Sequence, residues 1–328
     1  MFDNLKDRIF KISNDGEFNS LALNIFRYQA VSNKTYHTYL GQLGVNIHII
    51  DNLIEIPFLP VELFKYHKIV TGEENTGIIF ESSGTTSGDK SKHYVTDPQL
   101  YINSLTRCFS LFYGNPGDYC ILALLPSNIE RGESSLAFMT GHLIKLTGHP
   151  DSGFYLYNFE DLIKKLSQLE RKKQKTLLLG VSFALLDLAE KYPVPLKHTI
   201  IIETGGMKNR REDMTREELH EILKKAFRVR EIHSEYGMTE LLSQAWSKRD
   251  GIFHTPPWMK IMIRDSYDPL SYLPVGKSGG INIIDLANIH SCSFIATQDI
   301  GKLHPNGSFE VLGRFDNSDI RGCTLMLE

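Results

Sequence analysis

The middle of the chain alternates between short apolar runs and segments with helical periodicity. The runs at 176–181, 198–203 and 229–233 have the length and apolar character of buried strands. Between them, residues 183–191 carry a helical pattern, and residues 215–227 predict a second helix that begins with a capping box. This order of strands and helices predicts a parallel, doubly wound sheet.

The segments on either side extend this pattern. Residues 1–70 look mainly helical, and a Thr-Asp-Pro sequence at 96–98 predicts the start of a helix that ends near residue 112. Residues 118–125 predict a buried strand, and 159–172 carry the leucine stripe of a helix. After residue 251 the pattern changes to short strands between glycine and proline turns, which predicts a smaller β-rich lobe. We expect strands in this lobe at 279–285, 293–297 and 307–312.

The composition of the 328 residues is that of a globular protein, with 41% hydrophobic and 23% charged residues. A net charge of −3 gives no basis for binding nucleic acid or an anionic membrane surface. The apolar runs are too short to span a bilayer, and the first residues lack the apolar core of a signal peptide, so we expect a cytoplasmic protein. Four scattered cysteines without C-x-x-C spacing predict neither a zinc site nor a disulfide framework: Cys108, Cys120, Cys292 and Cys323.

The richest chemical signal lies between Phe80 and Lys90. An apolar run at 77–80 predicts a strand that leads into a loop of small and hydroxyl-bearing residues: Ser82, Ser83, Gly84, Thr85, Thr86, Ser87 and Gly88. Glycines let backbone N–H groups turn toward a shared anion, the hydroxyls can donate to phosphate oxygens, and Lys90 adds positive charge. The spacing is not that of a Walker loop, which requires G-x-x-x-x-G-K-[ST]. A flexible polar surface loop is the alternative interpretation.

A second polar cluster, at 234–240, follows the third predicted strand with the sequence Ser-Glu-Tyr-Gly-Met-Thr-Glu. Tyr236 offers a flat face for a purine, Thr239 a hydroxyl, and Glu240 a hard oxygen ligand for Mg²⁺. The preceding strand ends at Gly205–Gly206. Ligands of doubly wound sheets bind beyond the carboxyl ends of the strands, which predicts that both segments belong to one site. A helix entry with an ordinary N-cap is the alternative for 234–240.

Two charged residues near the end of the chain also suit a nucleotide. The Asp299 carboxylate could bind the two hydroxyls of a ribose, and Arg314 could bridge ribose and phosphate. Taken alone, each also fits an ordinary surface charge or salt bridge.

In this order, the three motifs resemble those of the acyl-adenylate-forming superfamily, which includes acyl-CoA synthetases, luciferases and peptide-synthetase adenylation domains. The resemblance implies that the Ser/Thr/Gly loop holds the ATP phosphates, Tyr236 stacks on adenine and Thr239 contacts the α-phosphate. It further implies that Glu240 binds Mg²⁺ and Asp299 binds ribose, while Arg314 matches the hinge-proximal arginine. The implied nucleotide-binding set is Ser82–Gly88, Lys90, Gly205, Gly206, Tyr236, Gly237 and Asp299.

Within the superfamily, the chain is most similar to the LuxE-like acyl-protein synthetases, which are long-chain fatty acid–protein ligases. The likeness is carried by the strings at 57–65, 152–156, 236–245 and 316–323. Two departures from the superfamily are expected. The chain would lack the usual C-terminal domain, and its hinge string does not contain the usual lysine. LuxE-like proteins have a short tail with a cysteine that takes the acyl group, and Cys323 stands in that position. An inert tail cysteine is the alternative.

The resemblance implies an α/β fold with doubly wound, mostly parallel sheets and a smaller β-rich lobe, of the kind formed by the N-terminal domain of adenylating enzymes. We expect an α/β core with a helical N-terminal region at 1–250, a β-rich lobe of the same catalytic unit at 251–313, and a hinge remnant with the C-terminal tail at 314–328.

The expected function is an acid–thiol ligase that uses ATP and Mg²⁺ to activate a carboxylic acid, with a fatty acid as the first candidate. The acyl group would pass to Cys323, an acyl carrier protein, CoA or another acyl-accepting partner enzyme. The alternative is a degenerate protein that binds nucleotide or acyl-adenylate without catalysis. A serine-type acyltransferase is disfavoured because no G-x-S-x-G elbow is present. Residues 129–139 could line the acyl pocket or form helix core.

Overall fold

The computed structural model describes residues 3–73, 77–82, 90–125, 134–156, 158–205 and 214–315. Their contacts divide the chain into two compact units, one formed by residues 1–75 with 257–328 and the other by residues 76–256. No helix of the described residues is both long enough and apolar enough to cross a membrane.

The unit at 76–256 contains the parallel sheet that the alternating pattern predicts. In spatial order, its parallel strands are β5 (Gly153–Phe154), β4 (Cys120–Leu124), β6 (Thr176–Val181), β7 (Thr199–Thr204) and β8 (His233–Tyr236). The antiparallel strands β9 (Ala245–Ser247) and β10 (Ile252–His254) continue the sheet beyond β8. The α/β fold with a mostly parallel sheet is therefore confirmed.

The helices of this unit begin where the sequence supplies caps. They are α5 (Pro98–Tyr113), α6 (Ser135–Thr147), α7 (Phe159–Arg171), α8 (Ser182–Lys191) and α9 (Arg216–Phe227). Asp97, Ser134 and Asn158 accept backbone hydrogen bonds at the starts of α5, α6 and α7. At α9, the predicted capping box forms between Thr215 and Glu218.

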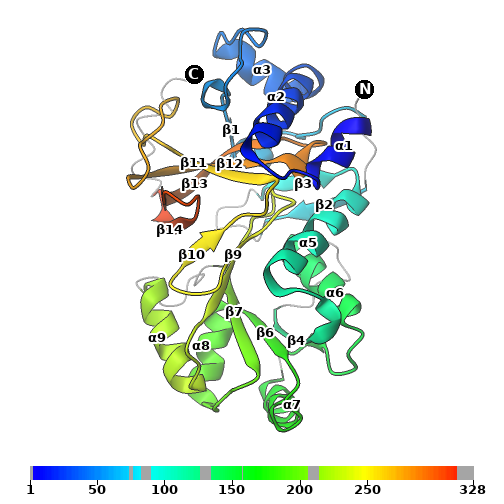
Figure 1. The fold of residues 1–328 in the computed structure, drawn as a ribbon, viewed down its shortest axis with the longest axis vertical. Helices are drawn as coiled ribbons and strands as arrows, with labels where there is room; N and C mark the ends of the chain where they lie inside the picture. Colours follow the sequence, from blue (N-terminus) through cyan, green and yellow to red (C-terminus); the bar gives the residue numbers. More distant parts are fainter. Residues whose placement is uncertain are drawn as a thin grey trace. The chain divides into compact units, whose positions relative to one another are not determined.

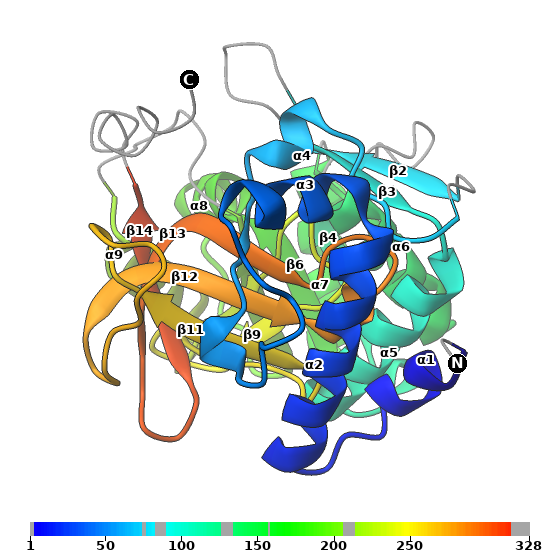
Figure 2. The same ribbon diagram turned by 90° about the horizontal axis from the view of Figure 1, so that it is seen from above.

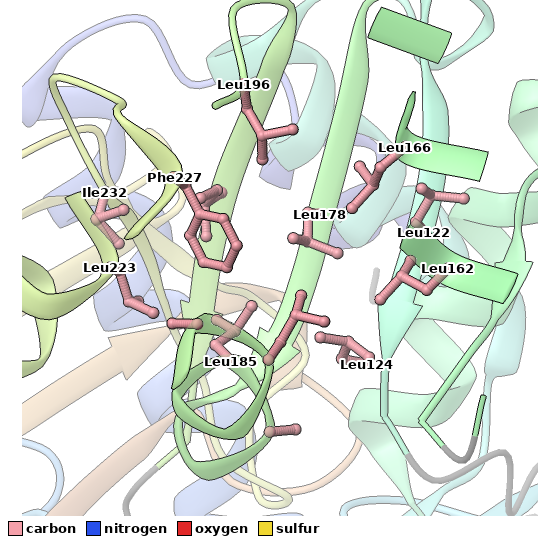
Figure 3. Packing of buried hydrophobic residues seen from close by; sticks show 14 of the residues in the cluster. Leu122, Leu124, Leu162, Leu166, Leu178, Leu185, Leu196, Leu223, Phe227 and Ile232 are labelled. Atoms are coloured by element: carbon pink, nitrogen blue, oxygen red, sulfur yellow. The ribbon is translucent and has the colours of Figure 1, made fainter. Parts of the chain in front are cut away.

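Leucine side chains of α7, α8 and α9 form one core with alternate residues of the strands. Figure 3 shows Leu162 and Leu166 of α7 beside Leu122 and Leu178, which come from β4 and β6. The intervening strand residues, such as Ile121, point to the opposite face and are also buried. On that face α6 packs against β4, and Figure 1 shows α5 and α6 beside β4, with α8 and α9 beside β7. Helices thus cover both faces of the sheet.

The third strand of the series begins later than the sequence pattern predicts. The prediction of 229–233 was wrong, because β8 begins at His233 and runs to Tyr236. Helix α9 ends with Arg228 in a left-handed conformation (φ 53°), and the exposed residues 230–231 lead back to the sheet. The shift places Glu235 and Tyr236 inside a strand, not in the loop beyond it.

A separate hairpin of this unit carries the predicted phosphate loop. Strands β2 (Ile78–Glu81) and β3 (Lys92–Val95) pair antiparallel, in agreement with the strand predicted before the loop. Phe80 anchors β2, since its ring lies 5.6 Å from Tyr101 of α5 and 5.4 Å from Phe138 of α6. Phe138 therefore belongs to a packed aromatic cluster, which favours the helix-core interpretation of that residue.

The other unit is built on an antiparallel sheet. Its strands are β11 (Met259–Arg264), β12 (Ser278–Asp285), β13 (Phe294–Leu303) and β14 (Phe309–Arg314), and β1 (Leu59–Pro60) pairs parallel with β13. This sheet agrees with the predicted β-rich lobe, although β13 runs well beyond the predicted 293–297. The helices of this unit are α1 (Asp3–Ile9), α2 (Asp15–Ser32), α3 (Lys34–Gln42) and α4 (Leu63–Tyr66).

Helix α2 joins the N-terminal region to this sheet (Figure 2). The ring of Phe26 lies 6.0 Å from that of Phe294 on β13. The buried Gln29 amide donates to the carbonyl oxygens of Asn288 and Ile289, both at 3.0 Å. These contacts place residues 1–75 in one unit with the C-terminal strands, whereas the sequence analysis groups them with the α/β core at 1–250.

Candidate active site

Three of the predicted nucleotide-binding residues, Gly205, Tyr236 and Gly237, lie at the carboxyl ends of the parallel strands in the unit at 76–256. Strand β7 ends at Thr204 and is followed by Gly205, while β8 ends at Tyr236 and is followed by the segment 237–240. Since β7 and β8 are parallel neighbours, these two ends share one edge of the sheet. Gly206 lies outside the described residues.

Gly205 makes the turn that ends β7. Its φ of +73° is a conformation that glycine adopts without strain. The Ser182 hydroxyl at the start of α8 lies 2.7 Å from the Gly205 carbonyl oxygen and 3.1 Å from a carboxylate oxygen of Glu203. The beginning of α8 therefore fixes how the chain leaves β7.

The ring of Tyr236 is packed against the interior of the unit. It is 9% exposed, and its centroid lies 5.9 Å from that of Phe253 on β10 in an edge-to-face arrangement. The guanidinium of Arg216 lies over the same Phe253 ring at 5.2 Å. Adenine stacking on Tyr236 stays a prediction, and the Phe253 ring packs against the Tyr236 ring.

Thr239 is tied to the hairpin that carries the phosphate loop. The Nδ1 atom of His93, on β3, lies 2.8 Å from the Thr239 backbone carbonyl oxygen. Because a carbonyl only accepts, Nδ1 of His93 carries the proton. His93 is fully buried and stands four residues after the loop segment 83–89 in sequence. This contact connects two motifs that lie 146 positions apart along the chain.

Glu240 is 5% exposed and directly follows Thr239. The carboxylate of Glu240 lies beyond the end of β8, where a nucleotide would bind, and its oxygens are hard ligands of the kind that Mg²⁺ prefers. The described residues contain no cluster of three or more metal-ligating side chains. A single carboxylate such as that of Glu240 still fits Mg²⁺, because Mg²⁺ is commonly held by one or two carboxylates together with substrate phosphates and water.

The base of the Ser/Thr/Gly loop is held as a hairpin end. The Ser82 N–H donates to the Ser91 carbonyl oxygen, and the Ser91 N–H donates to the Ser82 hydroxyl, each at 3.0 Å. Lys90 lies 3.2 Å from Glu81 and Lys92 lies 3.7 Å from it, so one carboxylate faces both lysines. The predicted loop residues Ser83, Gly84, Thr85, Thr86, Ser87 and Gly88 lie outside the described residues.

Two buried glutamates adjoin the predicted site, and the sequence analysis missed both. Glu203 faces α9, where Arg216 Nε lies 3.1 Å and His220 Nε2 3.7 Å from its carboxylate. Burial opposes ionisation of Glu203, but His220 and Arg216 outweigh it and hold its pKa below the usual value. The sequence signal that could have identified Glu203 is its position as an acidic residue at the end of the apolar run 198–203.

Glu235 is the second of these glutamates, and its pKa is shifted in the opposite direction from that of Glu203. It directly precedes Tyr236, is 8% exposed, and accepts a hydrogen bond from the Thr204 hydroxyl. Burial, with a further contribution from the Glu203 charge, raises the pKa of Glu235 to about 7, although the Thr204 hydrogen bond acts in the other direction. Adjacent strand ends therefore carry one ionised and one largely neutral carboxyl group below pH 7.

The two predicted residues of the other unit, Asp299 and Arg314, form an ion pair. Arg314 Nε lies 3.2 Å from Asp299 Oδ1. The Asp299 N–H donates to the Thr297 hydroxyl at 3.0 Å, and that hydroxyl donates to the Ile281 carbonyl oxygen at 2.9 Å. The backbone at Asp299 is thus fixed by a hydrogen-bonded chain across two strands.

The described cysteines do not suit an acyl acceptor. Cys108, Cys120 and Cys292 are all buried. Burial raises the pKa of Cys120 to about 11 and that of Cys292 to about 12, so neither is a thiolate near neutral pH. Cys323 lies outside the described residues.

Comparison with known proteins gives relatives in sequence and in fold. No family model matches the chain. The long-chain-fatty-acid–luciferin-component ligase of Aliivibrio fischeri is 24% identical over 337 residues, covering 92% of this chain and 85% of that protein. The fold is similar to that of ATP-bound MatB from Rhodopseudomonas palustris, with a TM-score of 0.55 and 17% identity over 72% of this chain and 47% of that one. It is also similar to 2-hydroxyisobutyryl-CoA ligase in complex with 2-HIB-AMP and CoA, with a TM-score of 0.63 and 12% identity over 93% of this chain and 72% of that one. The chain thus spans about half the length of the MatB structure.

Proposed function

Because this chain is a LuxE-like member of the acyl-adenylate-forming superfamily, we propose that it is an acid–thiol ligase that uses ATP to activate a carboxylic acid. The His93–Thr239 contact is the observation that best supports the proposal, since it joins the phosphate-loop hairpin to the segment Tyr236–Glu240. Two motifs that the reaction needs at one nucleotide are thereby held together within one compact unit.

In the proposed first step, a carboxylate oxygen of the acid attacks the α-phosphorus of ATP. A new P–O bond forms, the bond to the β-phosphate bridging oxygen breaks, and pyrophosphate leaves. The catalytic requirement is to orient the reactants and to stabilise charge on the phosphates. We assign the phosphates to the loop Ser82–Gly88 with Lys90, the α-phosphate to Thr239 and the ribose to Asp299 with Arg314.

Glu240 would hold Mg²⁺, which neutralises phosphate charge when bound. The support for this assignment is the low exposure of Glu240 and its place directly after Thr239, beyond the end of β8.

In the proposed second step, a thiolate attacks the acyl carbon of the acyl-adenylate. A thioester forms and AMP leaves with the electron pair of the broken C–O bond. The candidate acceptors are Cys323, the phosphopantetheine thiol of a carrier protein, and CoA. We do not propose Cys108, Cys120 or Cys292 as the acyl acceptor, because all three are buried.

The proposal for the acid substrate is based on the names of the similar proteins. The curated relative is named for a long-chain fatty acid and a luciferin component, whereas one solved structure holds 2-HIB-AMP and CoA. A fatty acid is therefore the first candidate, and the cytoplasm is the compartment that we propose. The test is ATP-dependent pyrophosphate release with a series of straight-chain acids and 2-hydroxyisobutyrate. Release with at least one acid is expected, and ATP binding without release for any acid would instead indicate a non-catalytic binding protein.

A further inference from the structure

The ends of β7 and β8 carry buried glutamates that face opposite sides of the sheet. Glu203 points toward α9, where Arg216 Nε and His220 Nε2 lie 3.1 Å and 3.7 Å from its carboxylate. Its neighbour Thr204 points to the other side and pairs in register with Glu235 of β8. The Thr204 hydroxyl donates to the Glu235 carboxyl group, so a side-chain hydrogen bond is added to the pairing of the two strand ends.

The carboxyl group of Glu235 also lies against the first residue of the following segment. A Cβ atom placed on Gly237 would lie 2.5 Å from Glu235 Oε1, closer than real Cβ contacts come. The position therefore requires glycine while the glutamate keeps this conformation. The same Cβ would lie 3.6 Å from Cγ of Gln244, which is also buried.

We infer that Glu235 is a positioning residue: its carboxyl group, bonded to Thr204 and packed on Gly237, fixes the conformation in which Tyr236–Glu240 leaves β8. The inference rests on the proposed function for what this segment does, which is to bind MgATP. It goes further than that function because Glu235 belongs to neither the phosphate loop nor the predicted set of nucleotide contacts.

The charge on Glu235 decides whether this arrangement holds. The Glu203 charge acts on Glu235 from the opposite face of the sheet, and Tyr113 of α5 interacts with it electrostatically; burial and the Glu235 charge both raise the pKa of the Tyr113 phenol. On its own strand, His233 is held neutral near pH 7, because burial and Lys248 lower its pKa to about 4. Ionised Glu235 would place a second buried negative charge beside Glu203, so the arrangement favours the neutral carboxyl group.

The test compares Glu235→Gln, which keeps a neutral hydrogen-bonding group at all pH values, with the unaltered chain. Glu231→Gln is the matched control, because Glu231 is exposed and lies just before β8. MgATP binding is measured by calorimetry between pH 6 and pH 8.5. If binding requires neutral Glu235, the affinity of the unaltered chain and of the control should fall roughly tenfold between pH 7 and pH 8.5. The affinity of Glu235→Gln should stay level.

Amide hydrogen exchange over residues 236–240 separates this inference from the proposed function, since it needs no nucleotide. After correction for intrinsic pH dependence, exchange should accelerate above pH 7 in the unaltered chain and stay constant in Glu235→Gln. If no variant binds ATP but this difference is present, the proposed function fails and the positioning role stands. If Glu235→Gln and the unaltered chain show the same pH dependence of exchange, the positioning role is wrong.

Discussion

Arg314 Nε and Asp299 Oδ1 lie 3.2 Å apart across the ladder between β13 and β14, and the two residues are paired in register. The pair is unequally solvated, because the Arg314 side chain is 64% exposed and that of Asp299 only 13%. Because the Arg314 guanidinium is largely solvent-exposed, we expect the pair to contribute only about 0–1 kcal/mol to folding. The contact therefore has little structural value, and it leaves the guanidinium accessible to a ligand.

Replacing Arg314 by Ala should weaken MgATP binding with little effect on stability. Loss of one charge-assisted contact to the nucleotide should reduce the affinity about tenfold, and the free energy of unfolding should change by less than about 1 kcal/mol. Calorimetric titration and urea unfolding measure the two quantities. Lys277→Ala, which removes another exposed cation of the same unit, should bind ATP normally. Equal affinity in the Arg314 and Lys277 variants would remove Arg314 from the site.

The His93 contact predicts a difference between two substitutions. His93→Leu removes the donor to the Thr239 carbonyl oxygen and should cost about 1–3 kcal/mol of stability, because that acceptor is then unsatisfied. His93→Asn can place an N–H near the position of Nδ1 and should retain most of the stability and the ATP affinity. Urea unfolding and ATP titration of both variants check this. Equal losses in the two variants would mean that the hydrogen bond does not hold the segment.

Glu235 predicts a dependence of stability on pH. Its pKa is raised to about 7 in the folded chain from the usual value of 4.5. Between these pH values the folded chain binds more protons than the unfolded chain, so the contribution of Glu235 to stability falls as pH rises and levels off above pH 7. The full loss corresponds to about 3 kcal/mol.

Glu235→Gln removes this loss, since an amide does not titrate. Urea unfolding at pH 4.5 and pH 8 should show Glu235→Gln gaining about 3 kcal/mol relative to the unaltered chain between the two conditions. Glu231→Gln, at an exposed position, should follow the unaltered chain. A constant difference between Glu235→Gln and the unaltered chain would show that Glu235 titrates near its usual value.

Cys323 carries the prediction for the acyl acceptor. With ATP and a suitable labelled acid, the chain should acquire a label that hydroxylamine releases, as expected for a thioester. Cys323→Ser should lose this label and keep pyrophosphate release, whereas Cys108→Ser should retain both, because Cys108 is buried. Acyl transfer from the Cys323→Ser variant to a carrier-protein thiol at the normal rate would show that the carrier is the direct acceptor.

The elements of the parallel sheet were largely predictable because their signals are local. The strand at 176–181 and the capping box that begins α9 follow from apolar runs and short-range side-chain bonds. The contacts of Gln29 with residues near 290 could not be foreseen, because no local pattern records a hydrogen bond across 259 positions. The role of Glu235 was hidden for the same reason, since it depends on the register that pairs it with Thr204.

The motifs of the candidate site could be recognised in the sequence, but the residues that contact these motifs and hold them in place could not. Tyr236, Thr239 and Glu240 are adjacent in sequence and are recognisable as one string. Phe253 and His93, which hold this string, are separated from it in sequence and carry no signal of their own. These contacts depend on tertiary packing and on hydrogen bonds to the backbone, and neither can be predicted from the periodicity of the sequence.

Pyrophosphate release by the Glu240→Gln variant is the decisive measurement for the proposed adenylation reaction. Glu240 is proposed to bind the Mg²⁺ of the bound nucleotide. The variant should fold normally, as shown by its circular dichroism and unfolding midpoint. With ATP, Mg²⁺ and the preferred acid, its rate of pyrophosphate release should fall about a hundredfold, which corresponds to about 3 kcal/mol of lost stabilisation. A folded Glu240→Gln variant that releases pyrophosphate at the unaltered rate would contradict the account.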